Sequence, residues 1–101
     1  MKVEVIGVVY IFEVGDIVCA LAGRDKEKRF VVVGILDENY VFIADGKSRK
    51  IDSPKKKKIK HIEISSKAAN LENLKDGRFT NSILRKIIDE YSEYSKYSNR
   101  T

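Results

Sequence analysis

Short apolar segments separated by turn residues make up the middle of this chain. β-Branched and aromatic residues are frequent in three of them, at 17–21, 30–36 and 40–44, and the residues between them are rich in Gly, Asp, Asn and charged side chains. Each segment has the length of a strand and is too short for a typical helix. Because the chain has 101 residues, we expect one compact domain with a modest hydrophobic core.

Turn signals mark the ends of these three strands and predict two further strands. Asp37-Glu38-Asn39 predicts a tight hairpin turn, because Asp and Asn bond their own backbone and tolerate positive φ. Asp45-Gly46 is a second turn signal, and Pro54 ends the pattern before a run of lysines. The expected strands cover 17–21, 30–36, 40–44, 48–51 and 59–64, and the last has Ile62 and Ile64 on one face. Five short strands predict a mainly β fold, a small barrel or sandwich over residues 14–66.

The segment before the predicted barrel, residues 1–13, is apolar and β-branched. Two interpretations fit this N-terminal extension. It forms an extra strand at the edge of the domain, or it presents an apolar surface to a protein partner or to a second copy of the chain. The sequence does not decide between them.

Residues 67–101 predict a helical tail. A short helix is expected at 67–74, and Thr80 has the position of an N-cap for a second helix. Phe79 and Leu84 are spaced as a hydrophobic staple across that cap. Three tyrosines recur every three residues near the end of the chain, a spacing that favours a helix end packed on the barrel over a platform for stacking bases. They are Tyr91, Tyr94 and Tyr97.

Positive charge is concentrated in one stretch of the chain. Residues 47–60 contain eight bases and one acid, so this stretch carries +7 while the whole chain carries +5. The remainder is slightly acidic, and such a concentrated basic stretch is typical of a surface that binds a polyanion. The bases are Lys47, Arg49, Lys50, Lys55, Lys56, Lys57, Lys58 and Lys60.

The four consecutive lysines, 55–58, are the strongest functional signal. Successive side chains of an extended segment point to opposite faces, so these lysines cannot all lie on one buried surface. A flexible row of point charges suits phosphate groups better than base edges. The alternative interpretation is a solvated, charged strand edge that prevents aggregation.

Residues that could support catalysis or bind a metal are scarce. Cys19 is the sole cysteine, lies in an apolar run and is expected to be a buried thiol without a disulfide or CxxC partner. His61 is the sole histidine, and we expect it to be structural or to face RNA. The chain has no GxxxxGK[ST] loop and no GxGxxG motif. We therefore expect no enzyme activity, no metal and no cofactor.

No segment of the sequence resembles a membrane span or a secretion signal. The longest apolar run, 5–12, is far shorter than the roughly 20 residues of a spanning helix. No small-residue cleavage pattern follows it. A single cysteine fits a reducing compartment. The sequence thus predicts a cytoplasmic protein that does not bind membranes.

Residues 14–51 resemble the KOW motif of ribosomal and transcription-elongation proteins. The matching parts are the Gly15-Asp16 entry, the strand through Leu21, the glycine-led basic loop 23–29 and the valine-rich strand 30–36. Residues 55–63, KKKKIKHIE, are similar to the basic run and following strand of the fourteenth e-type large-subunit ribosomal protein of archaea and eukaryotes. The whole chain most resembles the short bacterial relatives of that protein.

The resemblance implies an SH3-like barrel that binds RNA, often within the ribosome. In KOW proteins the first loop contacts RNA, which carries over here to Gly23, Arg24, Lys28 and Arg29, and Lys26 adds charge to the same loop. Gly23 is the expected positive-φ residue that reverses the chain. The leading hypothesis is that this loop, the basic stretch 47–60 and His61 bind ribosomal RNA. The alternative is a protein-interaction module, because SH3-like barrels also bind proteins and some KOW domains work beside RNA polymerase.

Overall fold

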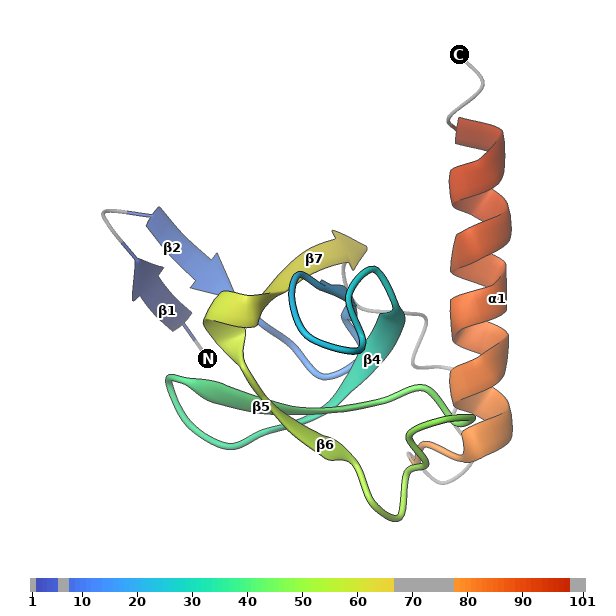
Figure 1. Ribbon diagram of the computed structural model, residues 1–101, viewed down its shortest axis with the longest axis horizontal. Coiled ribbons are helices and arrows are strands. Elements are labelled where there is room, and N and C mark those ends of the chain that lie inside the picture. The colour runs from blue at the N-terminus through green and yellow to red at the C-terminus, as the bar shows by residue number, and fades with distance from the viewer. Residues whose placement is uncertain (1, 6–7, 67–77, 99–101) are drawn as a thin grey trace.

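Five antiparallel strands form a sheet in the order β6-β5-β4-β3-β7 (Figure 1). The computed structural model describes residues 2–5, 8–66 and 78–98, and the side chains of 12–66 and 78–90. The strands are β3 (Ile17–Ala20), β4 (Arg29–Ile35), β5 (Tyr40–Ala44), β6 (Lys55–Lys58) and β7 (Ile62–Ser66). One 3-10 turn, η1 (Ile59–His61), joins the two edge strands β6 and β7. This short connection brings the two edges together, so the sheet curls into the predicted SH3-like barrel.

The interior of the barrel is filled by the inward faces of the strands. Val41 and Ile43 of β5 are fully buried, whereas Tyr40 and Phe42 lie on the outer face, as the two-residue alternation of a strand requires. Cys19 is half-buried and not fully buried as predicted, because it alternates with the inward-facing Val18 and Ala20 and therefore lies on the other face of β3. The core cluster is Phe12, Val18, Ala20, Phe30, Val32, Val41, Ile43, Ile59 and Ile62.

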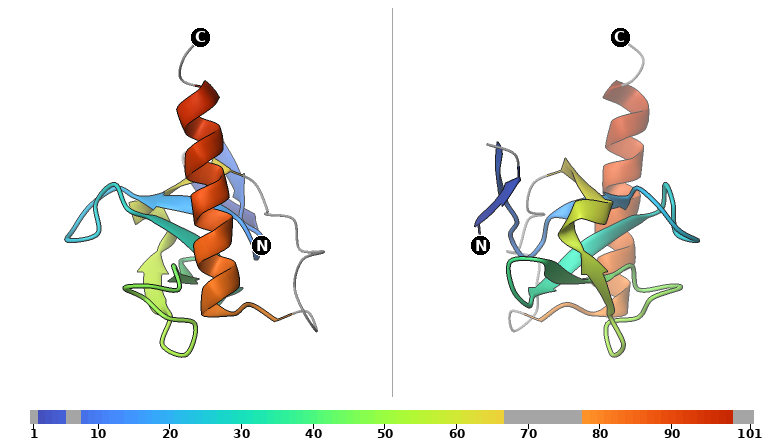
Figure 2. Two further views of the ribbon diagram at one scale, coloured as in Figure 1. Left: turned by 90° about the vertical axis from the view of Figure 1, so that its right-hand side faces the viewer. Right: turned by 60° about the vertical axis from the view of Figure 1, so that its left-hand side comes forward.

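A C-terminal helix, α1 (Asn81–Ser98), covers part of the outer face of the sheet. Thr80 Oγ1 accepts a hydrogen bond from the Ile83 N–H at 3.1 Å, which confirms the predicted N-cap. Leu84 is fully buried in a second cluster with Val31 and other outward-facing strand residues, and Phe79 packs against the same cluster. The last turns of α1 extend past the barrel (Figures 1 and 2). The predicted helix at 67–74 and the tyrosine side chains of the tail lie outside the described residues.

The N-terminal extension forms a hairpin of its own, on the side of the barrel away from α1 (Figure 1). Strands β1 (Lys2–Val5) and β2 (Val8–Ile11) pair with each other as a separate two-stranded sheet. The interpretation of an extra strand at the barrel edge was therefore wrong. The chain enters the core directly after β2, at Phe12, which is 2% exposed. A partner or self-association surface on the extension stays a prediction.

The fourth strand lies at 55–58, in the lysine run, and not at 48–51 as predicted. The Asp45 carboxylate accepts hydrogen bonds from the Lys47 N–H at 2.8 Å, the Arg49 N–H at 2.7 Å and Ser48 Oγ at 2.6 Å. These bonds hold the backbone after β5 in a loop. The predicted last strand also begins later, at Ile62, because residues 59–61 form η1.

The pKa of the Asp45 carboxyl lies below its ordinary value. Burial raises this pKa, but the hydrogen bonds from Ser48 Oγ and from the Arg49 and Lys47 N–H groups outweigh the effect. A lowered pKa in the folded state means that the stabilisation is fully present above the unfolded value of about 4 and is lost as pH falls through the folded value. We expect the wild-type protein to be more stable than Asp45→Asn at neutral pH, by a margin that shrinks below about pH 4. Urea denaturation of both proteins from neutral to acidic pH measures this margin. A margin that does not change with pH would contradict the prediction.

Candidate nucleic-acid interface

The lysine run is an edge strand whose side chains divide between two faces. In the described sheet, β6 is hydrogen-bonded on one side to β5. Lys55 and Lys57 lie opposite the core-facing residues of β5 and are half-buried. Lys56 and Lys58 lie on the outer face and are exposed. This arrangement confirms that the four charges point to both faces of an extended segment.

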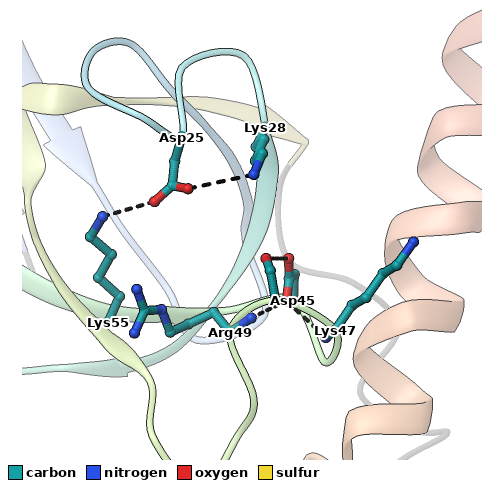
Figure 3. A network of polar contacts seen from close by, with 7 residues as sticks. Asp25, Lys28, Asp45, Lys47, Arg49 and Lys55 are labelled. Carbon is teal, nitrogen blue, oxygen red and sulfur yellow. Dashed lines mark hydrogen bonds and ion pairs between the residues drawn. The ribbon is translucent and has the colours of Figure 1, made fainter.

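An aspartate joins the first lysine of β6 to the loop between β3 and β4, residues 21–28. Lys55 Nζ lies 2.8 Å from Asp25 Oδ2, and Lys28 Nζ lies 3.8 Å from Asp25 Oδ1 (Figure 3). The hydrogen bond from Lys55 lowers the pKa of Asp25 and, with the charges of Lys55, Lys28 and Lys57, outweighs the opposing effect of burial. The KOW-like loop and the lysine strand, 30 residues apart in sequence, therefore form one surface.

The loop has the backbone geometry that the sequence predicted. Gly23 has φ +84°, and its carbonyl accepts a hydrogen bond from the Lys26 N–H at 3.2 Å. Glu27 also has positive φ, at 73°, a feature that the sequence did not signal. The side chains predicted to contact RNA here are all exposed: Arg24, Lys26 and Lys28 in the loop, and Arg29, which was predicted to end the loop but is the first residue of β4.

We expect Gly23→Ala to lower the free energy of unfolding by about 1–2 kcal/mol. A Cβ at this position meets no atom within 4 Å, so the cost comes from positive φ alone. Urea denaturation measures the effect. An unchanged midpoint would mean that the loop accommodates a side chain without strain.

The basic side chains of the loop between β5 and β6 point in two directions. The Arg49 side chain extends toward Lys55, whereas the Lys47 side chain extends toward α1 (Figure 3). Lys47 lines a groove of about 670 Å³ between the first loop, this loop and α1. Lys50 is exposed in the same loop. The groove is lined by Glu27, Lys28, Arg29, Asp45, Lys47, Ser48, Arg85, Ile88 and Asp89.

Arg85 is a basic residue of this surface that the sequence did not indicate. Its Nη1 donates a hydrogen bond to the Gly46 carbonyl at 2.6 Å, which ties α1 to the Asp45-Gly46 turn. The two residues are 39 positions apart, so no local pattern could have revealed the contact. The helix therefore adds a fourth base to a groove with Lys28, Arg29 and Lys47.

The remaining predicted residues, Lys60 and His61, lie apart from the Asp25 network. Both are exposed on η1, at the other end of β6 from Lys55. Lys60 borders a second groove of about 520 Å³, which is mainly apolar and lies beside Phe12 and Leu21. Within the described residues, no group of three or more His, Cys, Asp or Glu side chains could hold a metal ion.

The barrel, its KOW-like first loop and its basic edge strand place this protein in the class of KOW-type SH3-like barrels. Similar proteins include those named large ribosomal subunit protein eL14 in three archaea. The Staphylothermus marinus protein is 33% identical over 77 residues, which cover 76% of this chain and 77% of the relative. The Pyrobaculum calidifontis protein is 36% identical over 64 residues, 63% of this chain and 62% of the relative. The Desulfurococcus amylolyticus protein is 32% identical over 59 residues, 58% and 62% of the two chains.

No protein-family model matches the sequence. The chain nevertheless belongs to the eL14 family of ribosomal proteins, because the identity with the Staphylothermus marinus protein extends over three quarters of both chains. The match confirms the family resemblance recognised in the basic run and its following strand.

Proposed function

We propose that this protein binds the phosphate backbone of structured ribosomal RNA and acts, without enzyme activity, as a component of the large ribosomal subunit in the cytoplasm. The observation that carries the proposal is the ion-paired link from Lys55 through Asp25 to Lys28. It holds two basic segments on one surface. The names of the archaeal relatives support ribosomal RNA as the polyanion.

The proposed surface has three parts: the first loop between β3 and β4, the basic residues of the β5–β6 loop and of β6, and η1. Exposed lysines act as point charges for phosphates, and double-stranded RNA is recognised mostly through its shape and backbone. Gly23 shapes the first loop, and Lys60 and His61 extend the surface along η1. The contacting residues are Arg24, Lys26, Lys28, Arg29, Lys47, Arg49, Lys50, Lys55, Lys56, Lys57 and Lys58. Of the described helices, none is long and apolar enough to cross a bilayer.

The test is the salt dependence of binding to a structured RNA hairpin. If about five phosphates are contacted, affinity should fall roughly 10²- to 10³-fold as monovalent salt rises from about 50 to about 200 mM, because each contact releases counterions. The logarithm of the association constant should fall linearly with the logarithm of salt concentration. Absence of binding at low salt, or binding that does not respond to salt, contradicts the proposal.

A protein-interaction module, such as a KOW domain beside RNA polymerase, is the second candidate. The apolar groove favours it, since Leu21 is 45% exposed there beside Ile59 and Ile64. A partner that binds in this groove should be lost with Leu21→Ser, while RNA binding should remain, because this substitution changes no charge. Loss of RNA binding in this variant would show that the two surfaces are not separate.

A further inference from the structure

We infer that the outer face of β5 binds an unpaired RNA base by stacking it on the ring of Tyr40, with the neighbouring lysines on the phosphates of the same strand. This inference rests on the proposed RNA-binding function and adds a site that distinguishes unpaired bases from duplex. Phosphate contacts alone do not make that distinction.

The ring of Tyr40 lies among the outward lysines of β6. Tyr40 pairs with Lys58 in the antiparallel register, and Phe42 pairs with Lys56. Lys56 Nζ lies 4.9 Å and Lys58 Nζ 6.0 Å from the centroid of the Tyr40 ring. Tyr40 is only half-buried. An aromatic ring flanked by two ammonium groups has the components of a site for a base and its adjacent phosphates.

The backbone that carries Tyr40 is held firmly by the hairpin turn. Asp37 Oδ1 accepts hydrogen bonds from the Tyr40 N–H at 3.0 Å and from the Asn39 N–H at 2.8 Å. The Tyr40 carbonyl accepts a further bond from the Leu36 N–H at 3.1 Å. Little backbone freedom is left for binding to remove, which favours stacking on this ring.

A second aromatic ring extends the same face. Phe42, two residues along β5, is half-buried and lies close to Gly34. A Cβ at Gly34 would lie 3.4 Å from Phe42 Cδ2, an ordinary contact distance, so the ring lies directly over this glycine on the outer face of the sheet. Phe42 therefore continues the aromatic surface from Tyr40 toward α1.

The lysine contacts do not block the ring from a base. An exposed lysine is attracted to an aromatic face more weakly than a nucleobase stacks on it. When a base displaces the ammonium group of Lys56, that group can bind a phosphate of the incoming strand, which is a stronger electrostatic partner. Duplex RNA gains no stacking here, because its bases are already stacked inside the helix.

The test compares Tyr40→Leu, which removes the ring, with Tyr40→Phe, which keeps it. The probes are an RNA hairpin whose unpaired loop contains 2-aminopurine, and a blunt duplex with the same stem. We expect the wild-type protein to quench the 2-aminopurine fluorescence. Tyr40→Leu should lose the quench and bind the hairpin roughly 5- to 100-fold more weakly. Duplex affinity and salt slope should be unchanged, and Tyr40→Phe should behave as the wild type.

Several outcomes would overturn the inference. They are an unquenched loop base with the wild-type protein, unchanged hairpin affinity in a folded Tyr40→Leu variant, or an equal loss for hairpin and duplex. The wild-type quench needs no variant, so it remains decisive if Tyr40→Leu does not fold. Salt-dependent binding of both RNAs without a Tyr40 effect overturns this inference alone. Absence of binding to either RNA at low salt overturns the proposed function as well.

Discussion

Gly46→Ala is expected to lower the free energy of unfolding by about 3–5 kcal/mol, a large fraction of the stability of a small domain. Gly46 has φ +77°, and a Cβ there would lie 2.2 Å from the Asn81 carbonyl oxygen at the start of α1. The turn and the helix would have to separate. The hydrogen bonds from Arg85 Nη1 to the Gly46 carbonyl and from the Ile51 N–H to Asn81 Oδ1 would be strained, and Leu84 would become partly exposed.

Gly23→Ala is the matched control for this substitution. Both glycines have positive φ, but only Gly46 is in contact with the backbone of α1. Urea denaturation of the two variants separates backbone strain from the loss of helix packing. Amide hydrogen exchange in α1 should accelerate in Gly46→Ala and not in Gly23→Ala. Equal destabilisation of the two variants would contradict the direct packing of α1 on the turn.

Replacing all four lysines of β6 by glutamine is expected to have the largest effect on RNA binding. The log-log salt slope should become shallower by roughly 2–4 units if most of these lysines each neutralise one phosphate. The melting temperature should change little, because Lys56 and Lys58 are exposed and a single ion pair near the surface, such as that of Lys55 with Asp25, contributes at most about 1 kcal/mol to stability. The substitutions are Lys55→Gln, Lys56→Gln, Lys57→Gln and Lys58→Gln.

The control for charge removal is Lys86→Gln. Lys86 is exposed on α1 and does not line the groove that contains Arg85. Lys86→Gln and Lys56→Gln each remove one positive charge, but only Lys56 belongs to the proposed RNA-binding surface. We expect Lys56→Gln to change the slope by about 0.9 and Lys86→Gln to leave it unchanged. Unaltered affinity and slope in the four-glutamine variant would mean that the lysine run serves only to protect a strand edge.

Local sequence patterns were sufficient where neighbouring residues determine the structure. The strands near 17–21, 30–36 and 40–44 were predicted because apolar alternation and turn residues are short-range signals. The Thr80 N-cap belongs to the same kind of feature, since its hydrogen bond spans three residues.

Contacts between distant segments were not predictable in this way. Four consecutive lysines have a low intrinsic preference for strands, and they form β6 because β5 offers them a pairing edge. Residues 48–51 have a strand-like composition, but the Asp45 carboxylate holds the start of this segment in a loop. The position of Arg85 depends on its hydrogen bond to the Asp45-Gly46 turn, and the position of Tyr40 depends on its pairing with β6. Only the folded chain brings these residues beside the predicted bases.

Co-sedimentation of the tagged, full-length protein with ribosomal subunits tests the central claim most directly. We predict that at low salt the protein migrates with the large subunit and that high salt releases it, because the attachment depends on phosphate contacts. The four-glutamine variant should be released at a lower salt concentration than the wild type, whereas Lys86→Gln should be released with the wild type. A folded wild-type protein that stays at the top of the gradient at low salt would contradict the assignment to the large ribosomal subunit.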